Sequence, residues 1–326
     1  MIDHRIPKTI ISNIGLIPEY GLQYGQLGNL IALFSISRNQ NIVPSNVLRK
    51  HLIQIISKET MDGSYSIGIL GIMIGLLFLK LNKFIKIDFE DIFYKQHLEM
   101  TRFSEDLELT SETERFHYLE FLIYSCLLDK CNSELPLTIK DFDERKIAEF
   151  YTFNDINDVD KLYSYTQLAR RLILLHKLDA SLITKTKVNK WLNFIFESSK
   201  QNAILSYDSD FLVEVFQYSK ENEQDEILRF VADSIRDYIK NIKFNTINYK
   251  SFISSYNLLN VVDCVEDFEK AIGLRIMHDM EICINNLDGG IYKNTNLSTL
   301  MSLKGGFPRH IIYSNDKLVY KEAILL

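Results

Sequence analysis

The sequence contains few of the residues that interrupt helices, with only 5 prolines and 13 glycines among 326 residues. This scarcity excludes a turn-rich β architecture and favours long helices. The chain also lacks an excess of basic residues, since its formal net charge is −6. Without a basic surface to neutralise phosphates, nucleic-acid binding is not expected.

Long uninterrupted apolar runs are missing as well, and residues 1–8 have no apolar core from which a signal peptide would be expected. The most apolar stretch, residues 67–84, contains Lys80, Asn82 and three glycines, so we expect no membrane span. The cysteines lie within helical patterns, which favours reduced thiols and a cytoplasmic protein. There are four of them: Cys126, Cys131, Cys264 and Cys283.

The glycines that are present are unevenly distributed. Eight lie from Gly15 to Gly75, none between residues 76 and 272, and five from Gly273 onward. Two pairs with the same spacing precede aliphatic segments about 43 residues apart, which indicates an internal repeat. A glycine pair at the head of a helix lets another backbone approach closely. The two pairs are Gly25 with Gly28 and Gly68 with Gly71.

Helical periodicity predicts two kinds of helix. Residues 46–58, 187–196 and 225–242 each show one apolar stripe, which in the first includes Val47, Leu48 and Leu52. Other segments are apolar on nearly all sides, and such helices are buried while one-sided helices cover them. These segments are 27–36, 67–79, 118–128, 165–175, 211–218, 258–272 and 300–313.

The alternation of buried and covering helices predicts an all-α fold made of helical hairpins. A closed ring and an open solenoid both use such units. No linker rich in Gly, Ser or Pro divides the chain, so we expect a single domain over residues 1–326. Short strands are the other expectation, at residues 311–313 and 318–320.

Three stretches resemble the lanthionine synthetase C-like (LanC-like) peptide cyclases. Gly21-Leu-Gln-Tyr-Gly25-Gln-Leu-Gly28-Asn-Leu-Ile-Ala-Leu-Phe is similar to their first glycine-rich repeat, and Ser66-Ile-Gly68-Ile-Leu-Gly71-Ile to their second. Leu303-Lys-Gly305-Gly306-Phe is placed like the final glycine motif, and Lys321-Glu-Ala-Ile-Leu-Leu326 resembles the aliphatic ending. The resemblance implies an α/α toroid of about seven inner helices, each backed by an outer helix.

The resemblance also implies a chemistry, in which zinc held by two cysteines and a histidine activates a peptide thiol for addition to a dehydrated Ser or Thr. The family's ligand positions fall on Ser206, Cys264 and Val265, and a further family histidine falls on Tyr165. One ligand of three remains, and the chain contains no Cys-His dipeptide. A serine hydroxyl and a valine do not hold zinc. No cofactor is therefore expected, and zinc is expected only if the ligands are placed elsewhere.

Other groups of metal-ligating residues have a plainer interpretation. An improvised metal site made of Cys264, His278 and Cys283 is kept as an alternative. His117 with Cys126 and Cys131 raises the same question, but spacings in both groups differ from a zinc signature, and core packing is the preferred account. A dense group of acidic residues fits a solvated helix face better than a glycosidase site. Its members are Asp263, Glu266, Asp267 and Glu269.

These observations favour a pseudoenzyme of the LanC-like kind, a non-catalytic component that binds a peptide or a partner maturation enzyme in a ribosomal peptide (lantibiotic-like) modification pathway. The alternative is an enzyme, either a peptide cyclase or lyase or a hydrolase, that uses the toroid cavity without the zinc triad. A purely structural helical scaffold is the third hypothesis. Whether the chain is an enzyme stays open at this point.

Overall fold

All regular elements that the structure describes are helices, which confirms the predicted all-α class. The structure is a computed structural model, and its chain divides into two compact units. Unit 1 comprises Met1–Phe150 and Leu297–Leu326, and unit 2 comprises Tyr151–Asn296. The single domain expected over residues 1–326 stays a prediction. The described residues are 5–40, 44–57, 68–135, 159–200, 209–241, 301–303, 306–313, 315 and 317–326.

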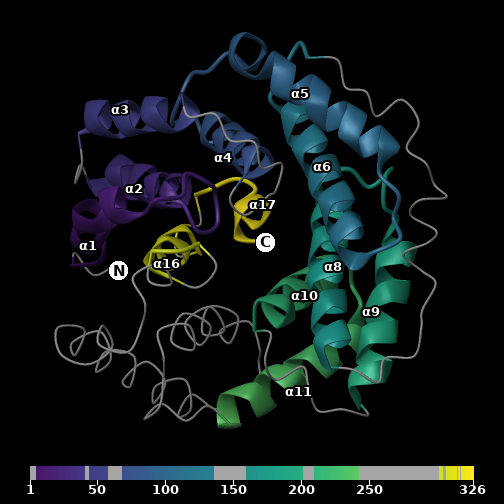
Figure 1. The fold of residues 1–326 in the computed structure, drawn as a ribbon. Coiled ribbons are helices and arrows are strands. Elements are labelled where there is room, and N and C mark those ends of the chain that lie inside the picture. Colours follow the sequence, from purple (N-terminus) through teal and green to yellow (C-terminus); the bar gives the residue numbers. More distant parts are fainter. Residues whose placement is uncertain are drawn as a thin grey trace. The chain divides into compact units, whose positions relative to one another are not determined.

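Unit 1 contains a row of buried helices in the order α16, α2, α4 and α6, each of which contacts the next. Helix α3 packs on α2, and α5 packs on α4 and α6. Both ends of the chain therefore contribute to one core, with α16 beside α2 and α17 beside α4 (Figure 1). The elements are α1 (Arg5–Asn13), η1 (Ile14–Leu16), α2 (Gln26–Gln40), α3 (Ser45–Ile56), α4 (Ile69–Leu81), α5 (Phe89–Asp106), α6 (Glu112–Lys130), α16 (Phe307–Tyr313) and α17 (Glu322–Leu325).

The difference between buried and covering helices is confirmed for α2, α3 and α4. Every residue from Leu70 to Leu79 in α4 is buried, and so is every residue from 27 to 36 in α2. In α3 the stripe that includes Leu48 and Leu52 is buried, but Val47 is 41% exposed. The prediction for Val47 was wrong because successive helical residues are about 100° apart, which turns Val47 away from the centre of the stripe.

Three glycines of unit 1 lie where neighbouring segments pass close to one another. A Cβ atom on Gly28 would lie 2.7 Å from the Leu303 side chain and closer still to the Leu22 carbonyl oxygen. A Cβ on Gly25 would overlap the backbone of the preceding turn. Gly75 in α4, which the sequence pattern did not single out, faces Leu27 of α2 in the same way. Glycine at these positions permits the approach of α2, α4 and the segment before α16.

The other glycines of the predicted motifs have different surroundings. Gly68 is the N-cap residue of α4, with φ −100° and ψ −167°, and Gly71 is buried in the first turns of that helix. Gly306 is buried directly before α16, whereas Gly305 lies outside the described residues. These positions are consistent with motifs at the heads of α4 and α16.

The two short strands expected near the end of the chain are absent from the described residues, and that prediction was wrong. Residues 311–313 belong to α16, and residues 318–320 lie in a turn that includes Tyr320 at φ 56°. Strand propensity is weak against tertiary context. Here Phe307, Ile311 and Ile312 are fully buried in a short helix that packs on α2.

Unit 2 repeats the same construction with two pairs of helices. Helix α8 (Val159–Leu178) contacts α10 (Ser209–Glu221), α9 (Lys185–Lys200) packs on α8, and α11 (Asp225–Asn241) packs on α10. The predicted inward faces of α9 and α11 are confirmed at their described residues except Leu228, which is half-buried. Their buried residues are Val188, Trp191, Leu192, Ile195, Ile227, Val231 and Ile235. The expected buried segment 258–272 lies outside the described residues.

Candidate functional site

Tyr165, the residue at the family's histidine position, lies in the contact between α8 and α9. Its side chain is buried, and its ring meets the Trp191 ring edge to face at a centroid distance of 5.5 Å. The Phe194 ring lies 6.0 Å away, and the Trp191 indole N–H donates a hydrogen bond to the Tyr165 carbonyl oxygen at 3.1 Å. Such an aromatic cluster stabilises the pairing of two helices. The surroundings of Tyr165 are therefore those of a packing residue.

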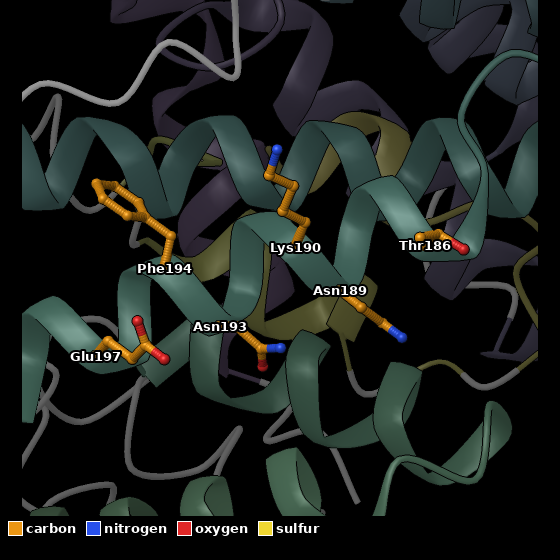
Figure 2. A pocket seen from close by; sticks show the side chains of 6 residues that line it. All are labelled: Thr186, Asn189, Lys190, Asn193, Phe194 and Glu197. Atoms are coloured by element: carbon orange, nitrogen blue, oxygen red, sulfur yellow. The ribbon is translucent and has the colours of Figure 1, made fainter.

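A groove of about 610 Å³ runs along α9 beside this aromatic cluster (Figure 2). Asn193, Lys190 and Glu197 are exposed in it, and Phe194 is half-buried. Amide, aromatic and single charged groups of this kind suit contact with a peptide chain. The described lining residues include one carboxylate, whereas sugar hydrolysis requires two. They are Thr186, Asn189, Lys190, Asn193, Phe194 and Glu197.

Asn189 fixes the inner side of the groove to the neighbouring helical pair. Its amide nitrogen donates to the Gln224 side-chain oxygen at 2.7 Å, and its amide oxygen accepts from the Tyr218 hydroxyl at 3.0 Å. Burial raises the pKa of Tyr218 to about 12. The phenol therefore keeps its proton near neutral pH and remains a donor to Asn189.

The other candidate ligand positions lie outside the described residues. These are Ser206, Cys264 and Val265, together with His278 and Cys283 of the improvised site. Their placement relative to Tyr165 and their roles stay predictions. The acidic cluster Asp263, Glu266, Asp267 and Glu269 lies outside the described residues too.

His117, Cys126 and Cys131 are within the described residues and have packing environments. The His117 ring lies 6.4 Å from the Phe103 ring, Cys126 is buried, and the Cys131 thiol lies 3.9 Å from the Leu77 carbonyl oxygen. In the described part of the chain no group of three His, Cys, Asp or Glu residues is arranged to hold a metal ion.

Two buried polar pairs were not identified from the sequence. In unit 1, His97 Nδ1 lies 2.9 Å from the hydroxyl of Tyr124, and burial raises the pKa of that phenol far above its usual value. In unit 2, Arg170 pairs with Glu214 at 2.6 and 3.0 Å. Each pair joins neighbouring helices, α5 to α6 and α8 to α10. A buried polar group requires a partner, but only the fold supplies the partner's identity.

The comparisons with known proteins gave no relative from which function could be transferred: no protein-family model, curated protein or solved structure matches the chain. In the described residues no helix is both long enough and apolar enough to cross a lipid bilayer.

Proposed function

We propose that the chain is a LanC-like α/α toroid whose zinc site is degenerate, and that it binds a peptide or a partner maturation enzyme without catalysing cyclisation. The pathway, a ribosomal peptide modification of the lantibiotic kind, is part of this proposal. The proposal rests on the resemblance of the glycine motifs and on the arrangement of helices in each unit.

The observation that carries the proposal is the contact of α2 and the turn before it with α16 and the segment before it, residues 301–303, which lie near opposite ends of the sequence. Asn29 of α2 donates a hydrogen bond to the Met301 carbonyl oxygen at 2.7 Å, and the Leu303 N–H donates to the Gln23 carbonyl oxygen at 2.7 Å. A closed ring requires its first and last repeats to meet, whereas an open solenoid keeps them apart. Buried helices that contact buried neighbours, with α3, α5, α9 and α11 as covering helices, also support a toroid.

The absence of catalysis is supported by the position of Tyr165. A tyrosine packed between Trp191 and Phe194 supplies no imidazole to a metal. A catalytic zinc needs three protein ligands and an open position. With Ser206 and Val265 at two of the family's ligand positions, a single thiol, Cys264, is left.

Metal analysis of the full chain, purified without chelator or histidine tag, tests the degenerate site. We expect zinc well below one equivalent. In the variant carrying both Ser206→Cys and Val265→His we expect tighter zinc binding, because two of the family's ligands are restored. About one equivalent in the wild type, removed by chelation and lost in Cys264→Ala, would overturn the proposal in favour of a zinc cyclase.

A thiol assay tests the absence of catalysis independently. The probe is a synthetic peptide with one dehydroalanine and one cysteine, and its free thiol is counted by alkylation and mass spectrometry. We expect the thiol to disappear no faster with the protein than without it, while fluorescence polarisation reports whether the same peptide binds. Thiol loss above the background rate would support the alternative of a metal-independent cyclase.

A further inference from the structure

The last residues of the chain, 317–326, are held in unit 1 by side chains that contact their backbone. The Val319 N–H donates to the Asn82 amide oxygen at 2.8 Å, and the Asn82 amide nitrogen donates back to the Val319 carbonyl oxygen at 3.1 Å. Asn82 follows α4 directly and is itself buried. One side-chain amide thus pairs with both backbone polar groups of a single residue, as a neighbouring strand would. We call residues 317–326 the strap.

The far end of the strap is held in the same manner. The Arg309 guanidinium donates to the Leu325 carbonyl oxygen at 2.9 Å and to the Leu303 carbonyl oxygen at 3.3 Å. The Gln23 amide nitrogen donates to the Leu326 carbonyl oxygen. Arg309 and Gln23 are both buried. These contacts connect the strap to α16 and to the turn before α2, which are the segments that meet in the core of unit 1.

The side chains of the strap divide into exposed and buried sets. Val319 is 49% exposed although its backbone is fully paired, whereas Ala323 and Ile324 are fully buried where α17 packs on α4. Figure 1 shows α17 beside α4. A four-residue helix has no stability of its own, because helix formation requires a costly nucleus. The ordered conformation of the strap therefore depends on the surface that it contacts. We call this surface, made of Gln23, Asn82, Arg309 and α4, the seat.

We propose that the seat is a peptide-binding surface occupied by the chain's own strap, and that the strap can leave it without the unfolding of unit 1. Its recognition rests on backbone hydrogen bonds and an aliphatic anchor, the pattern by which proteins bind short peptides in extended or turn conformations. Release of the strap uncovers apolar surface on α4. This inference goes beyond the proposed function and does not depend on it.

Native-state hydrogen exchange of the full chain at low urea concentrations tests whether the strap opens separately. We expect the Val319, Ala323 and Leu325 amides to exchange faster than amides within α2 and α4, at rates that urea hardly changes, because a local opening exposes little surface. Equal rates with the same urea dependence in the strap, α2 and α4 would overturn the proposal.

Variants of the same residue pair separate the backbone contact from the side-chain contact. Asn82→Ala removes both hydrogen bonds to Val319 and should accelerate exchange in the strap about tenfold. Val319→Ala changes only a half-exposed side chain and should alter it less than about twofold. Asn189→Ala removes two comparable hydrogen bonds from unit 2 and should leave exchange in the strap unchanged. Equal effects of Asn82→Ala and Val319→Ala would contradict backbone recognition.

Ile324→Asp provides a test that does not depend on removing a residue of the seat. A buried aspartate in the strap should release it while the seat stays folded. A fluorescent synthetic peptide with the sequence of residues 317–326 should then bind saturably to Ile324→Asp, should not bind to the wild type, and should lose binding in Ile324→Asp combined with Asn82→Ala. Loss of exchange protection throughout α4 in Ile324→Asp would show that the strap is an inseparable part of the core and would overturn the proposal.

Discussion

Arg170 of α8 and Glu214 of α10 form a bidentate ion pair with side chains only 4% and 12% exposed. The Arg170 guanidinium uses its remaining Nη1 to donate to the Gln167 side-chain oxygen at 3.1 Å. A buried arrangement of this kind holds two helices in register, and it becomes costly when one partner is removed.

Glu214→Gln should therefore lower the free energy of unfolding of unit 2 by roughly 3 kcal/mol, because it leaves a buried guanidinium without a counter-charge. Urea unfolding followed by circular dichroism measures the change. The control is Glu99→Gln, which breaks an exposed pair between Glu99 (62% exposed) and Lys95 (83% exposed) and should have almost no effect. Similar effects of the two substitutions would show that burial does not determine the strength of the Arg170–Glu214 pair.

Gly28→Ala should destabilise unit 1 by roughly 1–3 kcal/mol, because the new methyl group meets the Leu22 carbonyl and the Leu303 side chain. Gly15 is the matched control, since nothing lies within 4 Å of a Cβ placed there. Gly15→Ala should be nearly neutral or slightly stabilising. Thermal unfolding of the two variants checks the difference, and a neutral Gly28→Ala would remove the argument for close approach at this crossing.

Cys131 should make stability fall at alkaline pH. Burial raises the pKa of its thiol to about 11 from 9.0, and the charge of Lys80 offsets part of that rise. Between these two values the unfolded chain releases a proton that the folded chain keeps, so folding is favoured less as the pH increases. The free energy of unfolding of the wild type minus that of Cys131→Ala should be smaller at pH 10.5 than at pH 8. A constant difference would contradict a partly buried thiol that stays neutral in the folded chain.

Ser111 and Glu114 form a capping box at the start of α6. The Ser111 hydroxyl accepts from the Glu114 N–H at 3.2 Å, and the Glu114 carboxylate accepts from the Ser111 N–H at 2.5 Å. Ser111→Ala should cost about 1 kcal/mol in urea unfolding. Hydrogen bonds from Ser111 and Thr110 lower the pKa of Glu114 below 4.5. The carboxylate's contribution is therefore complete above pH 4.5 and is lost as the pH falls through the lowered pKa.

Glu114→Gln separates the hydrogen bonding of the capping box from the titration of the Glu114 carboxylate. Glutamine keeps an acceptor for the Ser111 N–H but does not titrate, so the variant should lack the part of the acid-induced loss of stability that belongs to this box. Unfolding midpoints at pH 6, 4 and 3 provide the comparison. An unchanged pH profile would show that Glu114 titrates without being coupled to folding.

The sequence predicted the helices better than it predicted their partners. The apolar segments became α2, α4, α6, α8 and α10 because helical burial leaves a pattern of period 3.6 that is local in the chain. The pairing of Asn82 with Val319 and of Arg170 with Glu214 joins residues 237 and 44 positions apart, and nothing in either local sequence indicates the other member. The prediction of a strand at residues 311–313 was wrong because a contact with α2, which the local sequence does not indicate, outweighs local β propensity.

The candidate site was predictable in part. The glycine spacing indicated close approach at Gly25 and Gly28, and the structure places both against neighbouring backbone. The groove along α9 could not be predicted, because its polar residues fit an ordinary exposed helix face. The aromatic contacts of Tyr165 with Trp191 and Phe194 depend on how α8 crosses α9, which periodicity alone does not fix.

Because the core of unit 1 includes α2 and α4 as well as α16 and α17, the ribosome makes one part of that core before unit 2 and the other part after it. Unit 2, Tyr151–Asn296, is made between the two parts of unit 1. The ribosome adds roughly 5–20 residues per second, so the apolar surfaces of α2 and α4 stay without α16 and α17 for on the order of ten seconds or more. Newly made chains are therefore expected to depend on chaperones during this interval, and slowing translation late in the message should lower the yield of folded protein.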